Sequence, residues 1–128
     1  SMPMAMKWLL PSAQSGNASS QYLLAILYMK TAAVKNNMHE GSRWLKKSAD
    51  KGNKDAQFLY ASLLESKKLG YSNLEQSLEY YHKAALQGHP QAQERLKAFA
   101  RQMREQLNLP QNPANPPSGA SVDSPKAE

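Results

Sequence analysis

The chain has 128 residues, enough for one ordinary domain, with 16 Lys and Arg against 10 Asp and Glu and a formal charge of +6. It contains no cysteine, which excludes a disulfide framework, a thiolate nucleophile and a cysteine-based zinc site. No stretch of the sequence approaches the roughly 20 apolar residues that cross a bilayer, so no membrane-spanning helix is predicted.

The N-terminal run Trp8-Leu9-Leu10 is too short for the apolar region of a signal peptide, which needs about 7–15 residues. Ser1-Met2 resembles the remnant of a cleaved tag. The compartment therefore stays open: we expect a cytoplasmic protein if the natural chain starts near Met2, and a periplasmic one if an upstream signal peptide was removed.

One pattern occurs three times at a spacing of about 36 residues, which indicates a repeat solenoid. Four positions recur in one frame in each copy. They are an aromatic residue (Trp8, Trp44, Tyr80), an alanine (Ala13, Ala49, Ala85), a glycine (Gly16, Gly52, Gly88) and a glutamine (Gln21, Gln57, Gln93).

The first predicted helix covers residues 4–15 and ends at Gly16, because glycine readily takes the left-handed conformation that terminates helices. Pro11 removes a backbone donor, so we expect this helix to kink there or to restart with Pro11 in its first turn. A second helix is predicted over residues 19–31, followed by a turn over residues 32–37.

Further helices are predicted over residues 38–51, 55–68 and 74–87. Residues Trp44, Leu45, Ser48 and Ala49 form the inner face of the first of these. The expected helix stops are Gly52, Gly70 and Gly88, and the expected helix starts are Asn53, Asn73 and His89 or Pro90.

The last predicted helix has one apolar stripe and a polar back, which is typical of the capping helix of a solenoid. The stripe consists of Ala92, Leu96, Phe99, Ala100, Met103 and Leu107. Five of the eight prolines follow in residues 108–128, which are predicted to be a disordered tail. The predicted solenoid thus spans residues 4–107, as a half repeat, two full repeats and a capping helix.

The motif Lys83-Ala84-Ala85, followed by Gly88 and Ala92-Gln93, resembles the Sel-one-like repeat, a relative of the tetratricopeptide repeat. The resemblance covers about residues 4–106. It implies an all-α, right-handed α-solenoid of antiparallel helix pairs, used by many proteins as an adaptor or scaffold. The chain departs from the usual pattern at Lys97, where the family has a small residue, and at Pro11.

In this family the first helix of each repeat lines a concave groove that binds a partner protein or peptide. Carried over by position, the resemblance implies a groove that is apolar at one end and polar or charged at the other. Its residues would be Tyr22, Ile26, Met29 and Lys30, then Phe58, Ser62 and Glu65, and finally Glu94, Ala98 and Arg101. The alternative is that Tyr22 and Phe58 simply pack on neighbouring helices.

Catalysis is not expected, and neither a metal site nor a cofactor is predicted. His82 and His89 are separated by the helix-breaking Gly88, and no phosphate-binding glycine loop or nucleophile elbow is present. The leading interpretation, which the resemblance implies, is a non-enzymatic adaptor of a regulatory, assembly or immunity type.

Two alternatives stay open. The chain could be a fragment of a longer structural solenoid, or could form a homodimer through the exposed apolar groove. A nucleic-acid or anionic-surface binder is the weaker interpretation. It would use the lysines at positions 7, 46, 47, 51 and 54 and lose affinity steeply with salt.

Overall fold

The computed structural model describes residues 4–31 and 37–110. These residues form six α-helices and no strand. The helices are α1 (Met4–Gln14), α2 (Ala18–Lys30), α3 (Asn37–Asp50), α4 (Lys54–Ser66), α5 (Leu74–Leu86) and α6 (Pro90–Leu107). Most of the predicted turn at 32–37 and of the predicted tail lies outside the described residues.

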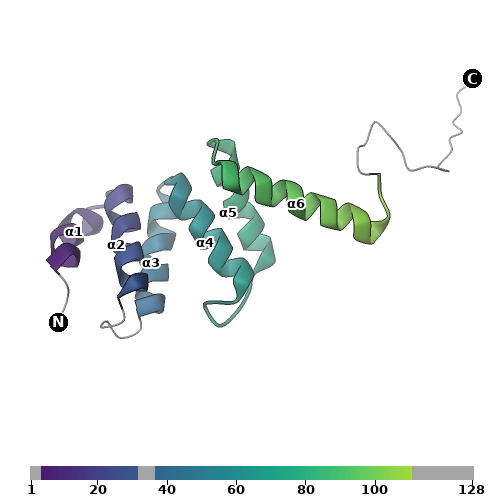
Figure 1. Cartoon of the computed structure of the whole chain (residues 1–128). Coiled ribbons are helices and arrows are strands. Elements are labelled where there is room, and N and C mark those ends of the chain that lie inside the picture. Colours follow the sequence, from purple (N-terminus) through teal and green to yellow (C-terminus); the bar gives the residue numbers. More distant parts are fainter. Residues whose placement is uncertain (1–3, 32–36, 111–128) are drawn as a thin grey trace, which may run out of the picture. The chain divides into compact units, whose positions relative to one another are not determined.

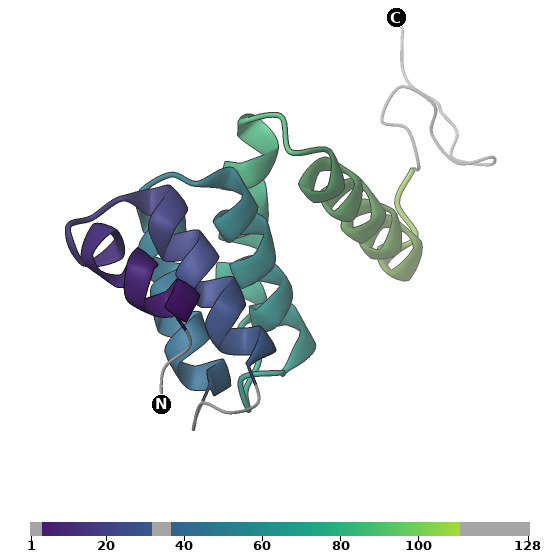
Figure 2. The ribbon, with the colours of Figure 1, turned by 60° about the vertical axis from the view of Figure 1, so that its left-hand side comes forward.

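The chain divides into two compact units, one through Gln93 and one from Glu94, and each is considered by itself. Within the first unit each helix from α1 to α4 packs on the next one in the chain (Figures 1 and 2). The predicted all-α repeat solenoid is confirmed.

The helix bounds agree with the sequence predictions to within two residues, with two informative differences. Helix α4 ends at Ser66 rather than Lys68, because Lys67 takes a left-handed conformation with φ 64°. Of the two outcomes expected at Pro11, the restart is wrong, since α1 is one helix from Met4 to Gln14 with Pro11 inside it, and the kink stays a prediction.

The turn after each B helix (α1, α3 and α5, the second helix of each repeat) has the same hydrogen bonds in all three copies. After α3, the Gly52 N–H donates to the Ala49 carbonyl (3.0 Å) and the Asn53 N–H donates to the Ser48 carbonyl (3.1 Å). This pattern requires a left-handed residue at the glycine, where φ is +107°. The same pair of bonds follows α1, at Gly16 and Asn17, and α5, at Gly88 and His89.

The repeated glutamine closes the same turn from the A helices (α2, α4 and α6, the first helix of each repeat). Each glutamine Nε2 donates to the carbonyl of the repeated alanine eight residues earlier. These bonds are Gln21 to Ala13 (3.0 Å), Gln57 to Ala49 (3.1 Å) and Gln93 to Ala85 (3.1 Å). Three of the four repeated positions therefore build the turn that joins one repeat to the next.

The fourth repeated position, the aromatic one, is buried to very different extents. Tyr80 is 6% exposed and meets Tyr60 of α4 edge to face, with ring centroids 5.0 Å apart. Trp44 is half-buried against the cluster that contains Leu24 and Tyr28 of α2. Trp8 is 77% exposed, because no described helix precedes α1 to cover it.

The inner face predicted for α3 is buried at Leu45, Ser48 and Ala49, while Trp44 is half-buried. Ser48 also donates a 2.6 Å hydrogen bond to the Ala18 carbonyl at the start of α2.

In the second unit, the predicted stripe of α6 becomes more exposed along the helix. Leu96 and Phe99 are half-buried, whereas Met103 is 40% and Leu107 59% exposed.

Candidate functional site

The residues predicted for the groove on α2 lie on one side of that helix and remain partly accessible. Tyr22, Ile26 and Met29 are half-buried and Lys30 is exposed. Met29 is also part of the fold: a Cβ atom added to Gly41 of α3 would lie 2.6 Å from the Met29 Cγ. Met29 is thus held against α3, while Tyr22 and Ile26 are half-buried on the same side of α2.

On α4 the equivalent of Tyr22 is Phe58, whose ring contacts two other rings. It stacks on His89, with centroids 4.6 Å apart, and makes a tilted contact with Tyr81 of α5 at 5.6 Å. Phe58 stays half-buried. Phe58 therefore packs on neighbouring elements, as the alternative interpretation expected, and keeps part of its side chain accessible.

The other two α4 residues form a polar edge with Tyr81. The Tyr81 hydroxyl donates to the Glu65 Oε1 (2.8 Å), and the Ser62 Oγ lies 3.2 Å from the same hydroxyl. These contacts hold Ser62 and Glu65 in place while both remain half-buried.

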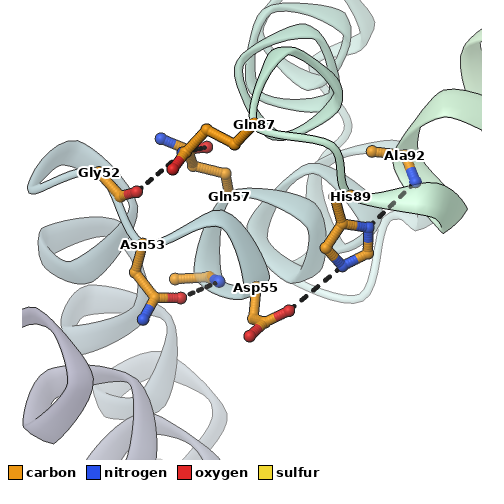
Figure 3. A network of polar contacts seen from close by, with 8 residues as sticks. Gly52, Asn53, Asp55, Gln57, Gln87, His89 and Ala92 are labelled. Atoms are coloured by element: carbon orange, nitrogen blue, oxygen red, sulfur yellow. Dashed lines mark hydrogen bonds and ion pairs between the residues drawn. The ribbon is translucent and has the colours of Figure 1, made fainter.

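His89, which stacks on Phe58, contacts Asp55 (Figure 3), and neither His89 nor Asp55 was among the predicted groove residues. The His89 Nδ1 accepts the Ala92 N–H (3.2 Å), so the neutral ring carries its proton on Nε2, which faces the Asp55 Oδ1 at 3.3 Å. Burial and then the negative charge of Asp55 raise the pKa of Tyr22 above its ordinary value. Asp55 thus places a negative charge near Tyr22.

The signal for His89 was present in the repeat register. Asn17 and Asn53 stand 36 residues apart and cap α2 and α4, each accepting the N–H of the third residue on. His89 occupies the next position of that series and caps α6 with a ring nitrogen instead of an amide oxygen.

Glu94, Ala98 and Arg101 lie in the second unit, where Glu94 and Arg101 are exposed and Ala98 is half-buried. The groove residues that share one unit are those of α2 and α4. We call the surface formed by Tyr22, Ile26, Asp55, Phe58, Ser62 and Glu65 the A-helix face.

The position just before the repeated glycine holds a different residue in each copy. The Gln87 Nε2 donates to the Gly52 carbonyl (2.8 Å) and to the Gln57 Oε1 (2.9 Å) (Figure 3). The equivalent residue one repeat earlier is Lys51. The equivalent acceptor, the Gln21 Oε1, is buried without a hydrogen-bond partner in the described part of the chain.

Replacing Lys51 with glutamine is expected to raise the free energy of unfolding by about 1 kcal/mol, because a buried acceptor gains a donor. The new amide would repeat the contacts of Gln87. Urea denaturation followed by circular dichroism measures the change. Lys51→Met is the control, since it removes the same charge without supplying a donor, and an equal gain in both variants would contradict the explanation.

Residues 4–31 and 37–110 offer neither a cluster of metal ligands nor a helix that could span a membrane. No group of three or more His, Asp or Glu side chains there is arranged to hold a metal ion. None of the described helices combines the length and the apolar character needed to span a membrane.

Comparison with known families identifies one match. The profile of the Sel1 repeat aligns with residues 2–17, 18–53 and 54–89, which is most of the chain. The last two segments each contain one A helix and one B helix, and the first contains α1 alone. No curated protein sequence shows a significant match.

Two solved structures share this architecture. A protective antigen of uropathogenic Escherichia coli strains, described as displaying an SLR fold, is 32% identical with a TM-score of 0.66, over 73% of this chain and 20% of that one. A Sel1 repeat protein from Oxalobacter formigenes is 27% identical with a TM-score of 0.67, over 73% of this chain and 27% of that one. The chain thus spans only a fifth to about a quarter of the length of these proteins.

Proposed function

Because this chain belongs to the Sel1 repeat family, whose members are generally non-catalytic scaffolds for protein–protein interaction, we propose that it is a non-enzymatic adaptor that binds a partner protein or peptide on its A-helix face. The observation that carries the proposal is the equivalence of three positions on α2 and α4. Tyr22 with Phe58, Ile26 with Ser62, and Met29 with Glu65 stand one repeat apart, and all are half-buried.

Half-burial suits a binding surface because each side chain is oriented by the fold and still accessible. Glu65 is held by Tyr81, and Phe58 by His89. A partner would therefore meet a surface that is already ordered, which reduces the entropy lost on binding.

The chemistry of the face indicates the kind of segment that fits it. Tyr22 and Ile26 offer apolar contact on α2, whereas Asp55 places an exposed carboxylate on α4. An amphipathic segment with apolar residues against α2 and hydrogen-bond donors or cations against α4 would match both helices.

Two polar side chains next to the face are held by the fold. Both ring nitrogens of His89 are used, one by the Ala92 N–H and one by Asp55. The Tyr81 hydroxyl donates to Glu65.

Site-specific photo-crosslinking tests the proposal. A crosslinker at Ile26 should capture a partner that a crosslinker at Leu23, on the same helix and 50% exposed, does not. With that partner purified, Tyr22→Ala with Ile26→Ala should weaken binding about tenfold or more, because these side chains would form the centre of the contact. Leu23→Ala with Leu86→Ala, two exposed apolar residues away from the face, is the matched control.

Equal capture from Ile26 and Leu23, or equal weakening by both double variants, would contradict the assignment to this face. If the captured partner is a second copy of the chain, light scattering would show a dimer that the Tyr22→Ala, Ile26→Ala variant loses. The self-associating alternative would then replace the adaptor.

A further inference from the structure

A concave surface lies outside the residues of the A-helix face. It is a cavity of about 460 Å³ between the first half of α3, Tyr60 of α4 and the loop that joins α4 to α5. Its volume falls within the usual range of ligand sites, about 300–1,000 Å³. We call it the basic cavity.

Its charged lining residues have one sign. Arg43 and Lys46 line it from α3 and Lys68 lines it from the loop, whereas no Asp or Glu is among the lining residues. A concave surface lined by a single sign of charge concentrates the electrostatic potential and attracts oppositely charged ligands.

Nearby carboxylates compensate part of this charge. Glu40 pairs with Arg43 (3.0 Å) and Asp50 pairs with Lys46 (2.9 Å), but Lys68 forms no ion pair with the described residues. The two pairs are exposed and lie within one helix, so each contributes only about 0–1 kcal/mol. An incoming carboxylate can therefore replace either partner at little cost.

The loop wall of the cavity is defined by its own hydrogen bonds. Lys67 and Gly70 have positive φ angles, 64° and 90°, and the Gly70 N–H donates to the Lys67 carbonyl (3.0 Å). The Asn73 N–H donates to the Leu64 carbonyl (3.0 Å), and the Asn73 side chain caps α5 by accepting the Gln76 N–H. These bonds hold Lys68 and Tyr71 against the cavity.

Two tyrosines complete the polar lining. Tyr60 is 5% exposed and is hydrogen-bonded to Tyr71, which is 53% exposed. A tyrosine hydroxyl can donate one hydrogen bond, so the exposed Tyr71 side chain offers a donor to a ligand in the cavity.

We propose that the basic cavity binds a short acidic segment of a partner protein, with its carboxylates on Arg43 and Lys68 and on the Tyr71 hydroxyl. Arginine is suited to this task because its planar guanidinium can grip a carboxylate with two hydrogen bonds. Arg43 already binds both oxygens of Glu40, at 3.0 and 3.2 Å.

Two features favour a peptide over a nucleic acid. Met38 and Leu69 place apolar side chains in the cavity lining, where they can contact the apolar residues of a peptide. Nucleic-acid binding rests on many phosphate contacts along an extended basic surface. Here the acids Glu40 and Asp50 interrupt the cations of α3.

Fluorescence anisotropy with a short fluorescein-labelled peptide of alternating glutamate and leucine tests the proposal on the full chain. Arg43→Gln with Lys68→Gln should weaken binding about tenfold or more, since two desolvated charge contacts are lost. The control, Lys7→Gln with Lys54→Gln, removes the same charge from exposed positions outside the cavity and should weaken binding by less than about threefold. Circular dichroism checks that every variant is folded.

Tyr71→Phe separates recognition from general attraction, because it keeps the charge and the ring and removes only the hydroxyl. It should weaken binding about fivefold, the effect of one hydrogen bond. A matched peptide of glutamine and leucine should not bind.

Three results would overturn the proposal. One is the absence of saturable binding of the glutamate peptide by the unmodified chain. Another is equal weakening by the two double variants, which would leave only attraction to net charge. The third is displacement of the peptide by a single-stranded oligonucleotide that binds more tightly. None of these readouts depends on the A-helix face, so the two proposals fail independently.

Discussion

Replacing Gly41 with leucine is expected to lower the free energy of unfolding by about 3 kcal/mol, because the contact between α2 and α3 has no room for a side chain. A Cβ atom at this position would lie 2.6 Å from the Met29 Cγ and 3.1 Å from the carbonyl oxygen of Ala25. The carbonyl belongs to the α2 backbone and cannot rotate away. The two helices would therefore have to separate, and Met29 would move with α2.

Urea denaturation monitored by circular dichroism measures this effect. His39→Leu is the control, since His39 is exposed on the same helix and the same side chain should be tolerated there. Met29→Ala in the Gly41→Leu background should restore part of the loss by removing one of the two clashes. A Gly41→Leu variant as stable as the unmodified chain would show that α2 and α3 can separate freely.

Stability is also expected to fall by about 3 kcal/mol between pH 10 and pH 12, because Tyr60 must ionise in the folded protein at a higher pH than in the unfolded chain. Burial, the neighbouring Tyr71 and Asp50, and a hydrogen bond to Tyr71 raise the pKa of Tyr60 from 10.0 to about 12. The unfolded chain releases this proton near pH 10. The contribution of Tyr60 is thus complete below pH 10 and is lost as the pH rises through about 12.

Denaturation curves across this range for the unmodified chain and for Tyr60→Phe isolate the contribution, because lysine ionisation is common to both. Tyr60→Phe should show a shallower decline. Tyr80 should add to the decline in the same direction, since burial and its 2.6 Å hydrogen bond to the Asp50 Oδ1 raise the pKa of Tyr80. Parallel curves for the two proteins would contradict the assignment to Tyr60.

The helices and turns could be predicted from the sequence because they depend on residues close together in the chain. The Gly52 turn is closed by Ala49, Ser48 and Gln57, which all lie within five residues of Gly52 in the chain. A glycine that can adopt a positive φ and an asparagine that can cap a helix act locally. Their recurrence every 36 residues then indicates the repeat architecture.

The candidate site was less predictable. The register correctly aligned Tyr22 with Phe58, but it carried no information on what lies beside each ring. Phe58 meets His89 and Tyr81, which are far from it in sequence, while Tyr22 lies in the field of Asp55. The position of a residue within the repeat therefore predicted the side of the helix on which it lies. The accessibility of its side chain depended on tertiary neighbours that the repeat pattern does not specify.

By itself, then, the sequence determined where helices begin and end, which residues build the turns, and that the fold repeats. Only the tertiary structure decided how the same repeated position is used in each copy. Trp8 and Tyr80 are equivalent in the register, yet one is 77% and the other 6% exposed. The physical reason is that burial and charge depend on what the adjoining helices bring, and Tyr80 has Tyr60 of α4 against it, whereas Trp8 has no described helix in that place.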